Sequence, residues 1–158
     1  GQVEIANYNS PMQVVISGGS AALERVVAAI KPLRAMKLHV SAPFHCHLME
    51  SAARRLGEVI DTLAFHAPAW PVVRNIDARI IESAADAMEG LKRQVRSPVL
   101  WTTTIDLMVM KGVTTFVEVG PGNVLSGLIG RIAPQAARFN AGTLEEIQIL
   151  RETLSRQF

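Results

Sequence analysis

The sequence lacks the features that mark several classes of protein. Its 158 residues contain no apolar run near the roughly 20 residues needed to cross a bilayer, so no transmembrane helix is expected. A single cysteine, Cys46, excludes an internal disulfide framework and a metal site built from several cysteines. Sixteen basic residues against 14 acidic ones leave a net charge of +2, too small and too dispersed to indicate nucleic-acid binding. With 49% hydrophobic and 19% charged residues, the chain is expected to be globular and cytoplasmic.

The first 40 residues have the pattern of a small α+β unit. Strands are predicted over Gln2–Ala6, Met12–Ser17 and Met36–Val40, with a turn over Asn7–Pro11. Ser20 is placed to cap a helix whose apolar stripe runs toward Pro32. This pattern begins almost at Gly1, without an upstream strand to pair with. We therefore expect a chain cut from something longer, with a processed terminus as the alternative.

From residue 41 onward, helical patterns alternate with strand patterns. Helices are predicted over Leu48–Ile60, Ala84–Val95, Val124–Ile132, from Ser97-Pro98 to Gly112, and after a Thr143 cap; strands are predicted over Val72–Ile76, Val113–Val119 and Arg138–Asn140. Such alternation predicts a mostly parallel sheet covered on both faces by helices.

His45 is the most conspicuous titratable residue, because the Pro-Phe-His-Cys segment places it between a loop and a helix. The positive end of the helix dipole disfavours a protonated imidazole there, and a neutral imidazole can act as a general base. A structural or exposed histidine is the alternative. His45 and His47 have an i,i+2 spacing that does not suit one helix face, so no metal site is predicted.

Two further motifs have both a chemical and a structural interpretation. Cys46 could be a nucleophile beside a histidine, but a small buried thiol is the favoured interpretation. The Gly120-Pro121-Gly122 turn resembles a phosphate-cradling loop but lacks the Walker lysine and the dinucleotide glycine pattern, which favours a tight strand-to-helix connection. No Gly-x-Ser-x-Gly nucleophile elbow occurs in the sequence. These residues leave half an active site and a binding module as open possibilities.

Taken together, the motifs resemble those of the bacterial malonyl-CoA:acyl-carrier-protein transacylase family, in its C-terminal half only. The matching segments, in the family's order, are Asn7–Pro11, Gln13–Gly18, Val40–Cys46 with Leu48-Met49, Pro71–Val73 with Asn75, Gln94 with Ser97–Val99 and Trp101, and Glu118–Gly122 with Val124-Leu125. They extend over nearly the whole chain, and their combination is specific although each motif alone is not.

The resemblance implies an α/β fold. In the family, an α/β-hydrolase-like parallel-sheet core carries an inserted ferredoxin-like α+β subdomain. Residues 1–40 would then form the later part of the small subdomain, and residues 41–158 the C-terminal part of the large acyltransferase subdomain. This expectation agrees with the α+β pattern of the first 40 residues and explains the missing partner of the first strand.

The resemblance also implies a reaction, the ping-pong transfer of malonyl from malonyl-CoA to the phosphopantetheine thiol of acyl carrier protein through a serine ester. The histidine that matches His45 takes the serine proton and returns it to the departing thiol. A main-chain carbonyl at the position of Gln94 orients that imidazole. The implied partners are acyl carrier protein, malonyl-CoA and the upstream N-terminal half of the enzyme; no metal or cofactor is implied.

Five more residues match positions with a suggested role in the family. Phe44 would crowd an α-methyl branch of the acyl group, with packing of its loop as the alternative. Asn7 and Asn9 would lie near the cleft between subdomains, with a turn-forming role as the alternative. Arg34 and Lys37 would contact the acidic carrier protein, with solvated surface charges as the alternative.

The departures from the family are as important as the matches. This chain has no Gly-His-Ser-x-Gly elbow with the nucleophilic serine, no first-strand glutamine of the oxyanion hole and no arginine for the malonyl carboxylate. We therefore expect no transacylase activity from the polypeptide alone. Alternative interpretations are an acyltransferase fragment of a polyketide or multidomain fatty acid synthase, and a non-catalytic remnant that binds carrier protein.

Overall fold

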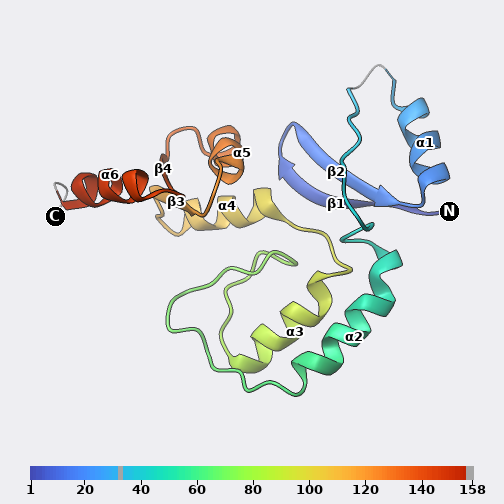
Figure 1. Ribbon diagram of the computed structural model, residues 1–158, viewed down its shortest axis with the longest axis horizontal. Coiled ribbons are helices and arrows are strands. Elements are labelled where there is room, and N and C mark those ends of the chain that lie inside the picture. The colour runs from blue at the N-terminus through green and yellow to red at the C-terminus, as the bar shows by residue number, and fades with distance from the viewer. Residues whose placement is uncertain (32–33, 156–158) are drawn as a thin grey trace. The chain divides into compact units, whose positions relative to one another are not determined.

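The computed structural model describes residues 1–31 and 34–155, and the chain is mixed α/β with a parallel sheet (Figure 1). It divides into two compact units, Gly1–Thr104 and Ile105–Phe158, and the boundary falls within helix α4 (Trp101–Met110). Within the described residues, no helix combines the length and the apolar character needed to cross a membrane.

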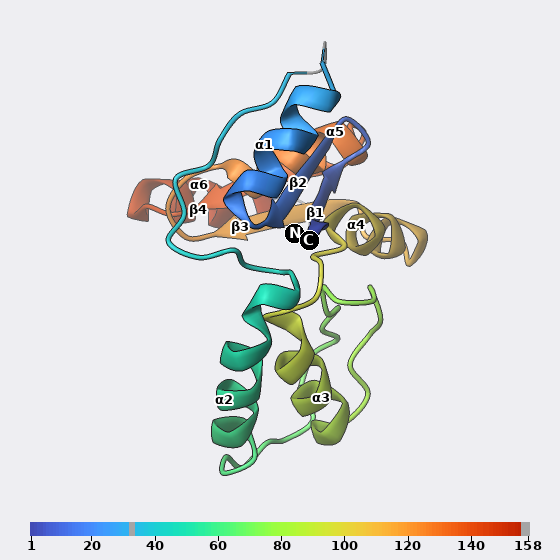
Figure 2. The ribbon, with the colours of Figure 1, turned by 90° about the vertical axis from the view of Figure 1, so that its right-hand side faces the viewer.

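The first unit opens with an antiparallel hairpin that helix α1 contacts (Figure 2). Strand β1 (Val3–Ser10) pairs with β2 (Gln13–Gly18) from Val3↔Gly18 to Ser10↔Gln13. The first strand is longer than predicted, because the residues expected in the turn continue the ladder and only Pro11 and Met12 turn. Helix α1 (Ser20–Ala29) begins at Ser20 itself. Gly19 is the N-cap, so the predicted cap by the Ser20 hydroxyl is wrong.

Two predicted strands of this unit are absent. Met36–Val40 is extended and exposed, and among the described residues it pairs with no strand. Pro32, at the predicted end of the first helix, lies outside the described residues. In place of the strand over Val72–Ile76, a single bridge joins Val73 to Ile80, since the chain reverses at residues 75–77. A strand needs a partner, and neither segment finds a ladder.

Two helices of the first unit, α2 and α3, lie next to the candidate site. A 3-10 turn, η1 (His47–Met49), leads into α2 (Glu50–Ile60), which packs beside α3 (Ala84–Gln94) (Figure 2). The Ser83 hydroxyl caps α3 by accepting a hydrogen bond from the backbone N–H of Asp86. The next helix starts at Trp101, not at Ser97-Pro98, because Val99 is extended against β1: its N–H donates to Ala6 O and its carbonyl accepts from Tyr8 N.

The second unit contains the parallel sheet. Strand β3 (Thr115–Val119) pairs in parallel with β4 (Ala137–Ala141), and helices α5 (Val124–Ile132) and α6 (Leu144–Ser155) follow the strands. Gly112, at φ +88°, ends α4 as predicted: its N–H donates to Val109 O while the N–H of Val113 donates to Met108 O, which is a Schellman ending. The Thr143 hydroxyl caps α6, as predicted, by accepting from Glu146 N.

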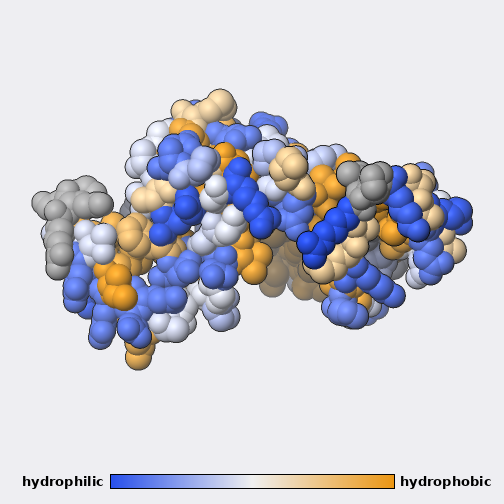
Figure 3. Space-filling model, turned by 90° about the horizontal axis from the view of Figure 1, so that it is seen from above, coloured by the Kyte–Doolittle hydropathy of each residue, from blue (hydrophilic) through white to orange (hydrophobic). Residues whose placement is uncertain are grey.

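The core is small, and much apolar surface is exposed. The buried hydrophobic residues are Ala6, Ala22, Cys46, Ala53, Ile60, Ile76, Ala78, Ile105, Leu128, Ile129, Ala133 and Ala136. Large apolar side chains reach the surface among hydrophilic ones (Figure 3). Met12, Trp70 and Val119, for example, are 92%, 79% and 82% exposed.

Candidate active site around His45

The segment from Ala42 to Cys46 folds into a tight turn that carries His45. Phe44 N–H donates to Ala42 O at 2.9 Å, and the Cys46 thiol donates to Pro43 O at 3.1 Å. Cys46 is fully buried, with 0% of its surface exposed. The contact with Pro43 occupies its sulfur within the turn, which supports the interpretation of Cys46 as a small structural thiol.

His45 has a backbone conformation that is uncommon for a residue with a side chain, with φ at +63°. This left-handed region costs roughly 1–2 kcal/mol for a residue other than glycine. The His45 N–H donates to Val95 O at 3.0 Å, and this bond connects the turn to the C-cap residue of α3. A backbone outlier held by such contacts is a common feature of functional sites.

The His45 imidazole is held by main-chain carbonyls. Its Nδ1 lies 3.0 Å from Gln94 O and 3.1 Å from Ser97 O, and both oxygens can only accept hydrogen bonds. Nδ1 must therefore carry the proton, and in the neutral ring the lone pair is on Nε2. The Gln94 side chain also donates to Ser97 O, at 3.3 Å. A neutral imidazole with a fixed tautomer and an available Nε2 is equipped to accept a proton.

Phe44 flanks the imidazole, and the residue is 45% exposed. The two ring centroids are 6.5 Å apart and the rings are tilted by 51°. Phe44 is therefore neither buried as a packing residue nor fully solvated, and it presents an apolar surface next to His45.

His47 belongs to a different contact. Its ring and its backbone N–H both bond the Glu4 carboxylate at the start of β1, and the ring's hydrogen bond holds the pKa of Glu4 below its ordinary value. The imidazoles of His45 and His47 thus have separate partners. Among residues 1–31 and 34–155, no group of three or more His, Cys, Asp or Glu side chains could hold a metal ion.

The other predicted site residues make no hydrogen bond with His45 in the described part of the chain. Asn7 and Asn9 lie in β1 and are half-buried; Asn7 pairs with Val15 and forms the bridge to Val99. They do not form the turn, which lies at Pro11 and Met12. Arg34 and Lys37 are exposed and form no ion pair among the described residues.

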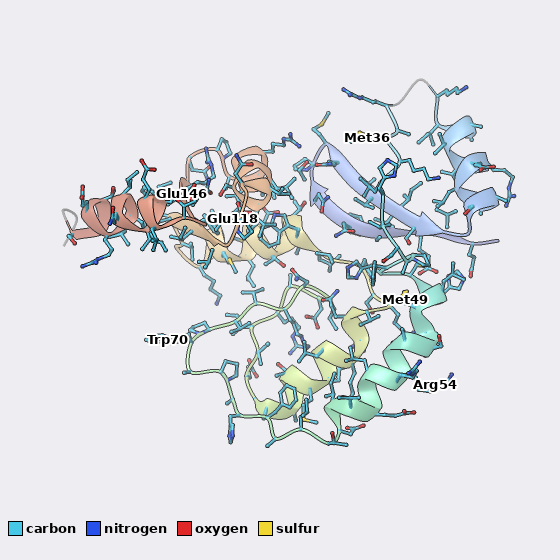
Figure 4. All side chains as sticks on the ribbon, in the orientation of Figure 1. Met36, Met49, Arg54, Trp70, Glu118 and Glu146 are labelled. Carbon is cyan, nitrogen blue, oxygen red and sulfur yellow. The ribbon has the colours of Figure 1, made fainter. Side chains whose placement is uncertain are left out.

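The Gly120-Pro121-Gly122 turn connects β3 to α5 in the second unit, and its glycines have φ of +122° and +93°. The first amides of α5 have an internal partner: the Glu118 carboxylate, labelled in Figure 4, accepts from Leu125 N at 3.0 Å and from Ser126 N at 2.7 Å. These bonds hold the pKa of Glu118 below its ordinary value. A carboxylate already occupies the place that a phosphate would take, which supports the prediction of a tight connection.

Comparison with known proteins places these observations in a family. The Escherichia coli (strain K12) protein named malonyl CoA-acyl carrier protein transacylase is 46% identical over 134 residues, which are 82% of this chain and 43% of that protein. The chain is a homologue of malonyl CoA-acyl carrier protein transacylases. It spans about half the length of the curated relatives it matches. No family model matches the chain.

Solved structures agree with this assignment. The transacylase from Clostridium perfringens has a TM-score of 0.93 and 37% identity, and the match covers 99% of this chain and 50% of that one. A malonyl-transacylase in complex with a type II polyketide acyl-carrier protein has a TM-score of 0.88 and 39% identity, and the match covers 96% of this chain and 50% of that one. The resemblance to the transacylase family is thereby confirmed.

Two residues of the site were missed by sequence reasoning. The carbonyls of Val95 and Ser97 bond His45 alongside that of Gln94. Every residue has a carbonyl, so a side-chain pattern cannot identify which ones face an imidazole. The only available signal was the position of both residues close to Gln94, in the segment that resembles the family.

Proposed function

We propose that this chain supplies the general base of a malonyl-CoA:acyl-carrier-protein transacylase, whose nucleophile lies on an upstream half of the enzyme. The observation that carries the proposal is the imidazole of His45, with Nδ1 bonded to two carbonyls and Nε2 left to accept a proton. The homology to malonyl CoA-acyl carrier protein transacylases over 82–98% of the chain supports the proposed reaction. The enzyme would act in the cytoplasm, without a metal or cofactor.

In the proposed reaction, Nε2 of His45 takes the proton of the serine hydroxyl as the serine oxygen attacks the malonyl carbonyl carbon. The new ester bond forms, the carbon–sulfur bond of malonyl-CoA breaks, and the protonated imidazole returns the proton to the CoA thiolate. The phosphopantetheine thiol of acyl carrier protein then reverses these steps and receives the malonyl group. The carbonyl of Gln94 keeps the proton on Nδ1 throughout.

Carbonyl groups suit this role because they orient the ring without adding a charge. A carboxylate in their place would stabilise the imidazolium, as in an aspartate-containing triad. Two neutral acceptors fix the tautomer and leave the imidazole able to give its proton back. Phe44 would limit the space beside Nε2, which favours an unbranched malonyl group over one with an α-methyl branch.

The proposal assigns each part of the chain to a subdomain of the whole enzyme. The parallel strands β3 and β4 would belong to an α/β-hydrolase-like core, and residues 1–40, with the β1–β2 hairpin, to the later part of an inserted ferredoxin-like subdomain. Asn7 and Asn9 would lie toward the cleft between them. Arg34 and Lys37 are exposed cations that would meet the acidic carrier protein. A solved relative in complex with its acyl-carrier protein supports that partner.

A chimera tests the proposal. The first half of the Bacillus subtilis relative, which is 37% identical to this chain over 158 residues, would be joined upstream of Gly1. Transfer of malonyl from malonyl-CoA to carrier protein is followed by the mass of the carrier. We expect transfer by the chimera, and a loss of about 10²–10⁴-fold in rate after His45→Gln. Equal transfer with and without the imidazole would show that His45 is not the base.

The chimera also separates the alternatives. A non-catalytic remnant that binds carrier protein predicts a soluble chimera that binds the carrier but transfers nothing, whatever stands at position 45. An acyltransferase from a polyketide synthase would share the preference for malonyl, because Phe44 is present, but predicts transfer to a polyketide carrier protein and not to the fatty-acid carrier protein. Phe44→Ser tests the role of the phenyl ring in acyl selectivity, because it removes the ring and leaves His45 in place. Transfer of methylmalonyl relative to malonyl should rise in this variant.

A further inference from the structure

Arg74 is an unusually buried cation in the first unit, with its side chain only 9% exposed. It bonds Asp77 with two nitrogens, Nε at 2.8 Å and Nη2 at 2.7 Å. These hydrogen bonds hold the pKa of Asp77 below its ordinary value and raise the pKa of Arg74. Both groups are therefore charged at neutral pH, and together they brace the loop between the bridged residues Val73 and Ile80.

The third guanidinium nitrogen of Arg74 reaches helix α3. Nη1 donates to Asp86 twice, to Oδ1 at 2.6 Å and to the backbone O at 2.9 Å, and lies 3.5 Å from Glu89 Oε2. The stem of Arg74 lies on Gly90, where an added Cβ would be 3.0 Å from Arg74 Cδ. Contacts at Asp86, Glu89 and Gly90 fix the helix along more than one turn.

The same loop also contacts the segment after α3. The main-chain carbonyl of Asn75, next to Arg74, accepts a hydrogen bond from Leu100 N at 2.8 Å. The loop that Arg74 braces therefore has two anchor points. It bonds to the body of α3, which precedes residues 94–97, and to Leu100, which follows them. These four residues include all three carbonyls that bond His45.

From these contacts we infer that Arg74 is a positioning residue. It fixes α3 and residues 97–100 relative to each other, so that the carbonyls of Gln94 and Ser97 lie within hydrogen-bond distance of His45 Nδ1. Arg74 does not touch His45 and acts on it through the helix. The catalytic consequence of this inference rests on the proposed function, but the effect on the imidazole does not.

The direct test is the tautomer of His45 in the full 158-residue chain. The chain has only four histidines, so nitrogen-15 labelled imidazoles can be resolved by NMR, and His45→Gln identifies the signal of interest. In the unmodified chain we expect the Nδ1–H tautomer. In Arg74→Met, with the carbonyls displaced, the ratio of Nδ1–H to Nε2–H should fall about tenfold.

Two further variants complete the test. One of them perturbs the same contact more mildly, in case Arg74→Met does not fold, and the other is a control. Gly90→Ala favours the helix but pushes Arg74 away from α3, and should lower the same ratio about threefold while the chain remains folded. Arg93→Met is the matched control. It breaks the half-exposed Arg93–Glu89 pair on the same helix, and should leave the tautomer unchanged.

An unchanged His45 tautomer in both Arg74→Met and Gly90→Ala would overturn the inference, whatever the activity. In the chimera described above, Arg74→Met should lower kcat about tenfold with little change in KM, because substrate contacts are not altered. An inactive parent chimera together with the expected tautomer shift would reject the proposed function and retain Arg74 as a positioning residue.

Discussion

Gly142 follows β4 at a point where two backbone segments almost touch. A Cβ at this position would lie 2.3 Å from Gly120 O, 3.0 Å from Gly120 C and 3.2 Å from the Cα of Pro121. All three atoms belong to the main chain, so no side-chain rotation can relieve the overlap. Gly142→Ala therefore requires the turn at residues 120–122 to move by about 1 Å.

This movement disturbs the packing of the turn and one backbone hydrogen bond. Overpacking of this kind typically costs about 1–3 kcal/mol, and displacement of the 3.3 Å bond from Gly120 N to Ala141 O adds about 1 kcal/mol. We expect Gly142→Ala to lower the free energy of unfolding by about 2–4 kcal/mol. For a urea m-value of about 2 kcal/mol/M, the midpoint falls by about 1–2 M.

Gly127→Ala is the matched control, since it makes the same change in the same unit. Gly127 lies inside α5, and nothing lies within 4 Å of an added Cβ. Alanine is the better helix former, so this variant should gain up to about 1 kcal/mol. Urea unfolding followed by circular dichroism measures both variants. The reasoning would be refuted if Gly142→Ala unfolded at the midpoint of the unmodified chain, or if both substitutions destabilised it equally.

Two more predictions concern single side chains. Gln94→Ala keeps the carbonyl that bonds His45 and loses only the 3.3 Å side-chain bond to Ser97 O, so malonyl transfer by the chimera should fall by about threefold or less; a hundredfold loss would mean that the amide itself takes part. Glu118→Gln should destabilise the chain at pH 7. Because the folded pKa of Glu118 lies below its unfolded value of about 4.3, its stabilisation is present above that pH and is lost as the pH falls through the folded pKa. Unfolding curves of the two proteins should therefore converge in acid, and a constant gap at every pH would contradict this assignment.

The sequence predicts helices more closely than strands. The predicted bounds of α5 are the observed ones, and those of α3 differ by one residue, because the hydrogen bonds and the apolar pattern of a helix lie within one segment of the sequence. Met36–Val40 and Val72–Ile76 have apolar residues suited to strands, yet form none. Strand formation depends on a remote partner, and periodicity within one segment does not reveal whether the partner exists.

The candidate site shows the same division. The loop at residues 43–46 could be predicted as the place of a reactive histidine, and Gln94 came from the family resemblance. The left-handed backbone of His45, the carbonyls of Val95 and Ser97, and the loop braced by Arg74 could not be predicted. They depend on how the loop, α3 and the following segment pack. Every residue has the same main-chain groups, so the sequence does not indicate which of them contact His45.

The positive φ of His45 restricts the residue types that position 45 can accept without backbone strain. Histidine, asparagine and aspartate are the residues besides glycine that enter the left-handed region most readily, and of these histidine alone supplies a base near neutral pH. In a gene copy freed from selection on chemistry but still selected for folding, drift at position 45 should settle on glycine, asparagine or aspartate. Alanine or a β-branched residue there would signal that the turn itself had been lost.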